Sequence, residues 1–250
     1  MRYVKTGQCI WCGKTEPEVC FRAAPHIVPH NLGSDEIGFD VCDDCNHYFG
    51  KATRGVPSCD LAKEIFNAFW IFGHNLDENT HKRFSSVFFN YYHSKRTIKV
   101  RSNFNSRVIT RQFKRSLYEV FLQKYHQVTG NGNHPMFEMV RRFARYNIGN
   151  PHVFYVFNNI ILCPGEEQRL ELPLNENVID EMMKSGLYRF WMGNQLFYIE
   201  VLPVAFQVNG YSFLRKEDKT MLLRVRGNEG IFELDDVIQL DIFMQRFNSK

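Results

Sequence analysis

The chain lacks several features that would place it in particular classes of protein. No segment reaches the roughly 18 uncharged apolar residues that a transmembrane helix needs. The first residues, Met1 to Lys5, are polar and lead directly into a cysteine motif, so we expect no signal peptide. The sequence also contains no internal repeat and no low-complexity tract. Together these absences predict a cytoplasmic protein without a membrane partner.

Acidic residues are missing from one long stretch. Between Asn79 and Tyr118 there is no Asp or Glu, although the net charge of the whole chain is only +4. Basic residues without neighbouring acids form a field that can hold phosphates, and a solvated basic surface without a partner is the alternative. The residues of this stretch that we expect to contact nucleic acid are Lys82, Arg83, Lys95, Arg96, Lys99, Arg101, Arg107, Arg111, Lys114 and Arg115.

The overall composition is that of a globular protein. Hydrophobic residues make up 44% of the chain and charged residues 23%, which excludes a disordered tail and supplies a sizeable core. Aromatic residues are numerous, with 23 Phe and 11 Tyr. They can fill a core or stack on bases, and composition does not divide the two roles.

The pattern along the chain indicates three regions and the fold class α+β. Residues 1–58 are rich in Cys, His, Gly and Pro and are expected to need a metal ion for folding. Residues 59–150 are expected to be mainly helical and to contact nucleic acid. Residues 151–250 are expected to form a β-rich domain that recognises a target or a partner.

Local patterns give the expected elements within these regions. Apolar residues at helical spacing predict three helices, and segments rich in Val, Ile, Phe and Tyr predict strands separated by turn signals. Pairs such as Gly193-Asn194 and Asn209-Gly210 resemble hairpin tips. The helices are expected at 61–72, 112–128 and 134–146, the strands at 97–101, 152–163, 187–192, 195–208, 211–214 and 220–226, and a closing helix or strand at 235–247.

Two C-x-x-C pairs carry the clearest chemical signal. Cys9 and Cys12 form the first pair, Cys42 and Cys45 form the second, and 29 residues separate them. Each pair can present two thiolates from one tight turn, and four sulfurs complete a closed tetrahedral shell for Zn²⁺. A closed shell leaves no position for water, so the sequence predicts a structural zinc ion. A redox C-x-x-C is the alternative, and the presence of two pairs disfavours it.

The residues around these pairs resemble a known family. The sequence reads C-x-x-C, then H-I-V-P-x-x-L-G starting at His26, then V-C-x-x-C-N-x-x-F-G ending at Gly50. This order is similar to the zinc-containing branch of the HNH endonucleases, over about residues 9–50. The resemblance implies a ββα-metal fold, in which two short antiparallel strands hold a catalytic histidine and a helix supplies a metal ligand.

The family resemblance also implies roles for individual residues. His26 would be the general base that deprotonates water, and Asn46 would be an oxygen ligand to a catalytic Mg²⁺ or Mn²⁺ ion. Plainer alternatives are a loop hydrogen bond for His26 and a helix N-cap for Asn46. Pro25 stands where many family members have the second, acidic metal ligand. His30 and His47 are the nearby candidates to replace it.

Three functions remain open from the sequence. The first is a metal-dependent endonuclease acting on DNA, with RNA as the alternative substrate, in restriction or phage defence. The second is a zinc-stabilised nucleic-acid-binding module that has lost catalysis, which the proline before His26 favours. The third is an interaction subunit whose C-terminal region binds a protein partner or a second copy of the chain.

Overall fold

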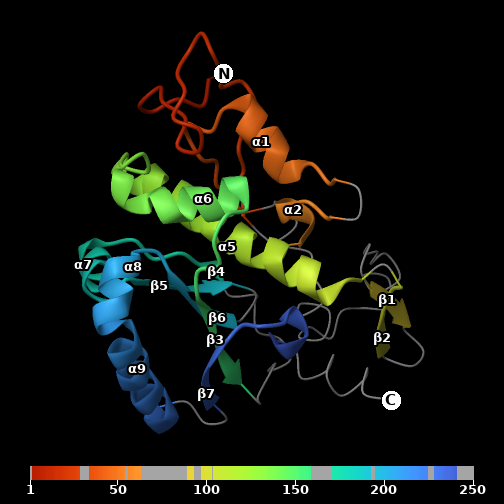
Figure 1. Cartoon of the computed structure of the whole chain (residues 1–250), viewed down its shortest axis with the longest axis vertical. Coiled ribbons are helices and arrows are strands. Elements are labelled where there is room, and N and C mark those ends of the chain that lie inside the picture. Colours follow the sequence, from red (N-terminus) through yellow and green to blue (C-terminus); the bar gives the residue numbers. More distant parts are fainter. Residues whose placement is uncertain are drawn as a thin grey trace.

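The protein is a mixture of helices and antiparallel sheet, as the α+β prediction required (Figure 1). Within the part of the chain that is described, no helix is both long and apolar enough to cross a membrane. The structure is a computed structural model that describes residues 2–28, 34–53, 56–62, 89–92, 97–102, 104–158, 170–192, 195–224 and 228–240.

The first half of the chain surrounds one long helix, α5 (Ser106–Thr129). The side chain of Asn105 accepts a hydrogen bond from the Val108 amide at its start, and Gly130 ends it in the left-handed conformation with φ 76°. The predicted helix at 112–128 is therefore confirmed and is longer at its N-terminus. The other elements of this half are α1 (Asp43–Gly50), α2 (Cys59–Ala62), β1 (Phe89–Tyr92), β2 (Thr97–Val100), η3 (Pro135–Phe137) and α6 (Glu138–Tyr146).

The second half is built on a five-stranded antiparallel sheet in the order β4-β5-β6-β3-β7. The predicted hairpin around 193–194 is confirmed, because β5 pairs with β6 from Leu187↔Glu200 to Met192↔Gln195. The elements of this half are β3 (Val153–Asn158), β4 (Leu170–Glu171), α7 (Glu176–Ser185), β5 (Leu187–Met192), β6 (Gln195–Glu200), α8 (Pro203–Ala205), η4 (Phe206–Gly210), α9 (Tyr211–Arg224), β7 (Asn228–Glu233) and η5 (Val237–Leu240).

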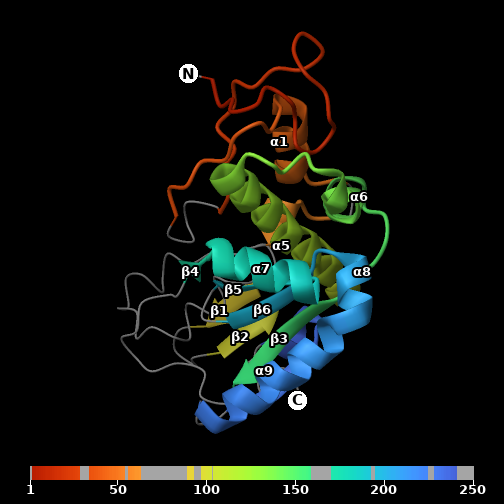
Figure 2. The same cartoon turned by 90° about the vertical axis from the view of Figure 1, so that its left-hand side faces the viewer.

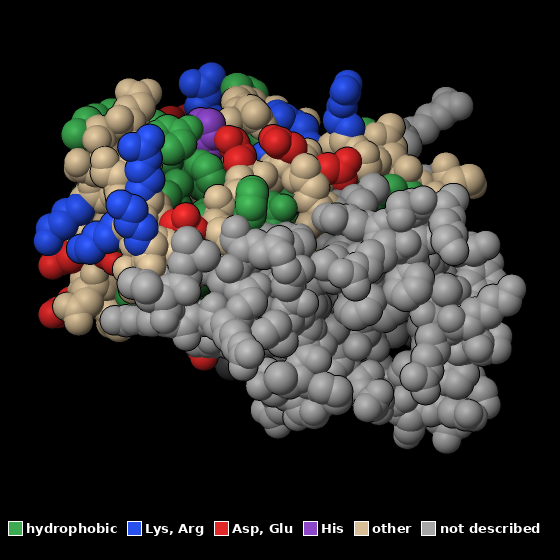
Figure 3. Space-filling view, turned by 90° about the horizontal axis from the view of Figure 1, so that it is seen from below, with side chains coloured by type: hydrophobic (Ala, Val, Ile, Leu, Met, Phe, Trp, Pro, Cys, Tyr) green, Lys and Arg blue, Asp and Glu red, His purple; other side chains and the backbone are tan. Residues whose placement is uncertain are grey.

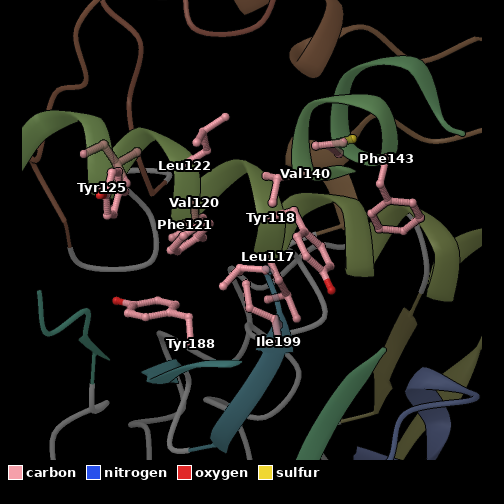
Figure 4. Packing of buried hydrophobic residues seen from close by; sticks show 14 of the residues in the cluster. Leu117, Tyr118, Val120, Phe121, Leu122, Tyr125, Val140, Phe143, Tyr188 and Ile199 are labelled. Atoms are coloured by element: carbon pink, nitrogen blue, oxygen red, sulfur yellow. The ribbon is translucent and has the colours of Figure 1, made fainter. Parts of the chain in front are cut away.

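Helices cover both faces of this sheet, and this explains the almost continuous apolar runs of its strands. On β6, Phe197 and Ile199 belong to the core shared with α5, whereas Leu196 and Tyr198 belong to a second core that includes Leu214 of α9. Figure 4 shows Leu117 and Phe121 pointing from α5 toward Tyr188 and Ile199 of the sheet. Figure 2 shows α9 lying along the sheet away from α5.

Three strand predictions in the last region are wrong in whole or in part. The predicted strand at 195–208 ends at Glu200, and residues 203–224, which include the predicted strands at 211–214 and 220–226 up to residue 224, form a continuous helical path through α8, the π-helical turn η4 and α9. Pro203 occupies the first helical turn. Gly210 is needed for packing and not for a hairpin, because a Cβ there would meet the ring of Phe206 at 2.1 Å. The C-terminal region is therefore as helical as it is β-rich.

The N-terminal region is not isolated from the rest of the molecule. One cluster of buried side chains extends from Cys9 and Trp11 through Phe113 and Phe121 of α5 to Phe197 of the sheet. Figure 1 shows the order of the layers, with the N-terminal region above α6 and α5, and the sheet and α9 below. The predicted helix at 61–72 lies outside the described residues apart from its first two positions. The boundaries at residues 58 and 150 stay predictions.

Candidate metal centre and catalytic residues

The four cysteines predicted to bind a metal lie together. The Sγ atoms of Cys9, Cys12, Cys42 and Cys45 are all within 4.8 Å of one another, and those of Cys12 and Cys42 are 3.8 Å apart. Tetrahedral coordination with Zn–S bonds of about 2.3 Å places neighbouring sulfurs about 3.8 Å apart. The donor set and its spacing therefore fit a metal ion such as zinc.

Local backbone structure brings the two pairs together. The first pair lies on a tight turn in which the Gly13 amide donates to the Cys9 carbonyl at 2.9 Å, with Gly13 at φ 72°. The second pair lies at the start of α1, where Cys42 is the N-cap residue and Cys45 is in the first turn. No side chain caps α1 with a hydrogen bond. A metal bound by Cys42 and Cys45 would therefore fix the start of this helix.

The crowded sulfurs need a positive counter-charge. Hydrogen bonds from Cys42 and Cys45 lower the pKa of the Cys9 thiol, so one thiolate forms easily. Hydrogen bonding to Cys42 and Cys9, together with burial, raises the pKa of the Cys45 thiol. Four thiolates at this separation would repel one another, and a divalent cation removes that repulsion.

A protein cation also lies beside the cluster. Arg145 of α6 donates a hydrogen bond from Nε to the Cys45 Sγ at 3.4 Å. Its guanidinium group lies over the Tyr48 ring, 3.8 Å from the centroid, and 5.4 Å from the centroid of Tyr146. No local pattern in the sequence predicts this contact, because Arg145 and Cys45 are 100 positions apart and meet where α6 packs on α1.

The residue predicted as general base lies on a short antiparallel bridge. His26 pairs with Ile37, the Ile27 amide donates to the Glu36 carbonyl at 3.0 Å, and the Gly38 amide donates to the Pro25 carbonyl at 2.7 Å. His26 is exposed, whereas Pro25 and Ile27 on either side are buried. Alternation along an extended segment thus presents the imidazole to solvent.

This bridge, which we call the His26 bridge (residues 25–28 and 35–38), lies directly on α5. Lys124 Nζ donates to Glu36 at 2.8 Å, and Gln127 Nε2 donates to the Ile37 carbonyl at 3.1 Å. A Cβ at Gly38 would meet Gln123 Oε1 at 2.7 Å and the Pro25 carbonyl oxygen at 3.3 Å, so glycine allows this approach without a shift of either group. The position of His26 is therefore fixed by a helix that begins 80 residues later in the chain.

A buried hydrogen bond between His126 and Asp40 anchors the segment between the His26 bridge and α1. His126 Nε2 lies 2.8 Å from Asp40 Oδ2, and both side chains are fully buried. The Gly132 amide donates to His126 Nδ1 at 3.0 Å, which assigns the proton to Nε2. Burial lowers the pKa of His126, and Asp40 opposes this effect only in part. This buried contact joins α5 to the N-terminal region.

The helix residues predicted near the catalytic metal lie on α1. Asn46 is half-buried in the second turn, so it is not the N-cap residue, and that alternative is wrong because Cys42 occupies the position. His47 is exposed in the last turn. His30 lies outside the described residues. Among the described residues, the only group of three or more His, Cys, Asp or Glu side chains placed to hold a metal is the cysteine cluster.

Most nearby carboxylates already have structural roles. Asp43 Oδ1 accepts from the amides of Arg22 and Ala23 at 2.8 and 2.9 Å. Glu36 pairs with Lys124, and Asp40 accepts from the backbone amides of residues 5–7 in addition to His126. Asp35 and Asp44 are exposed. Neither of them belongs to a group of three or more side chains placed to hold a metal ion within the described part of this region.

The described residues of the basic stretch do not form one surface. Arg101 and Arg107 are exposed as expected. Arg111 donates to the carbonyl oxygens of Asn147 and Gly149 at the end of α6. Lys114 and Arg115 are buried, at 6% and 3% exposure, so the expectation that they contact phosphate is corrected. The helical face on which they lie packs into the core. Lys82, Arg83, Lys95 and Arg96 lie outside the described residues, and of Lys99 only the backbone, in β2, is described.

Comparison of the chain with models of protein families, with curated proteins and with solved structures found no match. These comparisons therefore assign no family to it. What the cysteine cluster, the His26 bridge and α1 can do follows from their own geometry.

Proposed function

We propose that the protein is a metal-dependent endonuclease of the HNH type, with a structural zinc ion held by Cys9, Cys12, Cys42 and Cys45. The observation that carries the proposal is the order of elements around the cysteine cluster. An exposed His26 lies on an antiparallel bridge, and the next element along the chain is α1, which starts at the second cysteine pair and contains Asn46. This order supports the ββα-metal arrangement that the sequence motif implies.

In this proposal the zinc ion has a folding role. It joins the turn at residues 9–12 to the start of α1, and Arg145 ties the same cluster to α6. All four ligands come from cysteine side chains, so no coordination position is open for water or substrate. Catalysis is therefore assigned to other residues.

His26 is assigned the general base. A neutral imidazole accepts a proton near neutral pH, and its exposed position allows water and a phosphodiester to approach. Removal of a proton from water by His26 generates the hydroxide that attacks phosphorus, and the bond to the leaving oxygen breaks. When bound, a divalent cation would neutralise charge on the phosphate and the leaving group. Asn46, with His47 or His30, is assigned to hold it.

One observation favours a second candidate function. Pro25 is buried and has no ligating side chain, and three of the described carboxylates nearby, Glu36, Asp40 and Asp43, are engaged elsewhere. A protein without the second ligand would bind nucleic acid and not cut it. This zinc-stabilised binding module shares the fold of the nuclease and differs in the absence of turnover.

Plasmid cleavage separates the two functions. Supercoiled plasmid is incubated with the wild-type chain, with His26→Ala and with His134→Asn, in Mg²⁺, in Mn²⁺ and without added metal. His134 is an exposed histidine that caps η3, and asparagine keeps a capping side chain there. The nuclease predicts metal-dependent nicking by the wild type and His134→Asn, with a loss of at least about 100-fold in His26→Ala.

The other results have equally definite meanings. Equal nicking by all three proteins removes His26 from the base role. Retardation of DNA in a gel without cleavage in any metal favours the binding module. Zinc content is measured for each protein, because His26 is not a zinc ligand and its replacement must leave the cluster loaded.

A further inference from the structure

A groove of about 530 Å³ lies between α7 and α9, far from the cysteine cluster in the fold (Figures 1 and 2). We call it the α7–α9 groove. Its walls come from both helices and from η4, which precedes α9. Side chains that can donate hydrogen bonds line it, and Phe213 forms an apolar part of its surface. The lining side chains that can donate hydrogen bonds include Asn177, Lys184, Asn209, Ser212 and Lys216.

The acidic residues of α9 form hydrogen bonds within the protein. Glu217 accepts hydrogen bonds from Arg189 at 2.5 Å and from the Tyr198 hydroxyl at 3.0 Å. Asp218 Oδ1 accepts from the Ile231 amide at 3.0 Å. Both carboxylates therefore hold α9 on the sheet, and their negative charge is used inside the protein.

The basic residues of the same helix face outward. Arg215, Lys216 and Lys219 are exposed, and Lys184 in the last turn of α7 is exposed beside the same groove as Lys216. No ion pair involves any of these four side chains within the described part of the chain. Figure 3 shows basic side chains gathered at the left end of the described surface, where α9 lies in Figure 1.

Acids on the opposite wall limit this field without cancelling it. Lys184 and Lys216 line the groove together with Asp180 and Glu181 of α7, whereas Arg215 and Lys219 are exposed on α9 outside its lining. Glu181 lies 3.6 Å from Arg189, which Glu217 also contacts. Four exposed basic groups in and beside the groove therefore outnumber the two acids that line it, and this balance favours an anionic ligand.

The chemistry of the groove fits a chain of phosphates. Proteins contact the sugar–phosphate backbone mainly through Lys and Arg, with hydroxyl and amide side chains such as Ser and Asn as additional donors. We propose that the α7–α9 groove binds the backbone of the nucleic acid on which the protein acts. The choice of nucleic acid as the polyanion rests on the proposed nuclease function.

A membrane or an acidic protein fits the groove less well. Among the described residues of these helices, the exposed apolar side chains are Met183 of α7, Val204 of α8, Val208 of η4 and Tyr211 of α9, and polar or charged residues separate them in the sequence. More of the groove surface is apolar than polar, and the hydrogen-bond donors that line it, with the exposed bases beside it, favour an extended anion as the ligand. The proposal also places the interface where basic side chains are exposed, whereas Lys114 and Arg115 of the predicted stretch are buried.

Binding of a fluorescent 30-base-pair DNA duplex, measured by anisotropy at several KCl concentrations, tests the proposal. All proteins carry His26→Ala, so that the duplex stays intact. The test variant adds Lys184→Gln, Lys216→Gln and Lys219→Gln. Its binding should be about tenfold weaker or more, and its log–log salt slope should be smaller by about 3.

Two controls define the result. Arginine at the same three positions keeps the charge and should keep the affinity, which excludes a folding defect as the cause. Arg101→Gln with Arg107→Gln removes exposed charge from the predicted stretch, which is the competing interface, and should weaken binding less than the glutamine variant does. Loss of DNA binding in this second control, together with unchanged binding in the glutamine variant, would overturn the proposal. The proposal would also be wrong if the glutamine variant lost binding to anionic vesicles and kept its binding to DNA.

The groove and the nuclease can fail separately. If the wild type cleaves DNA and the glutamine variant binds as tightly as its parent, the groove proposal is wrong and the nuclease stands. If no metal supports cleavage and the glutamine variant still loses affinity, the groove stands and the nuclease is wrong. Absence of any binding to DNA or RNA in the wild type overturns both.

Discussion

Arg145 Nε lies 3.4 Å from the Sγ of Cys45, and the two residues are 100 positions apart in the chain. This hydrogen bond places a guanidinium group against a cysteine cluster whose sulfurs would carry negative charge on binding zinc. The same side chain lies over the ring of Tyr48. The contact therefore links metal binding to the position of α6 on α1.

Replacing Arg145 should weaken metal binding. Arg145→Ala removes the donor to Cys45 and the cation–π contact, and loss of such supporting contacts lowers metal affinity by about 10- to 100-fold. Arg145→Lys keeps the charge, so its zinc affinity should lie between those of the wild type and Arg145→Ala. Zinc affinity is measured by competition with a chromophoric chelator. Arg142→Ala, an exposed arginine of the same helix, is the control, and an equal loss there would contradict the prediction.

Removal of zinc should unfold the N-terminal region before the rest. Because Cys42 caps α1 without a side-chain hydrogen bond, the start of this helix depends on the bound metal. Chelation, or Cys42→Ser, should speed amide hydrogen exchange in α1 and residues 2–28, with a smaller change in α5 and the sheet. Uniform exchange across all of these elements would show instead that the metal stabilises the whole core.

The stability of the protein should fall as pH decreases below about 6.5 because of His126. Burial lowers the pKa of this histidine, so the unfolded chain takes up the proton first as pH falls. The stabilising contribution of neutral His126 is complete above the unfolded pKa and declines below it. Urea unfolding of His126→Gln and the wild type from pH 7.5 to 5 should show a narrowing difference in free energy. A constant difference would contradict this assignment.

Arg115 should contribute to folding and not to nucleic-acid binding. Its guanidinium group donates to the Ala144 carbonyl from Nε and from the second terminal nitrogen, and to the Tyr48 hydroxyl at 2.8 Å. Arg115→Gln should lower the free energy of unfolding by about 2–4 kcal/mol, because these buried acceptors lose their donors. Arg107→Gln, at the exposed start of α5, should change it by less than about 0.5 kcal/mol. Chemical denaturation measures both.

Two glycines with positive φ offer a matched test of the helical path after β6. At Gly186, with φ 75°, a Cβ would meet the Phe206 amide nitrogen at 2.3 Å. At Gly149, with φ 92°, a Cβ would meet nothing within 4 Å. Gly149→Ala should cost about 1–2 kcal/mol from backbone strain, and Gly186→Ala substantially more. Similar melting temperatures for the two variants would contradict the packing of η4 on the end of α7.

Local sequence signals predicted the elements whose causes are local. Gly130 ends α5, Pro135 starts the turn before α6, and the pattern of apolar residues at 187–192 gives a strand, whereas the cap at Asn105 was not predicted. The errors fall at 203–224, where a strand-like composition forms a helix. There the aromatic residues serve a core on the second face of the sheet, and Asn209-Gly210 allows close packing against Phe206.

The sequence by itself determined the cysteine cluster, because two C-x-x-C pairs restrict their own sulfurs to short turns and only the distance between the pairs was left to the fold. Only the tertiary structure decided which charges are available. Lys114 and Arg115 belong to a stretch that contains no acidic residue, and yet both are buried. Helix α9 contains both acidic and basic residues, and it exposes mainly the basic ones. Burial depends on which face of a helix meets the core, and partners such as Arg189 and Arg145 come from distant elements that no local pattern specifies.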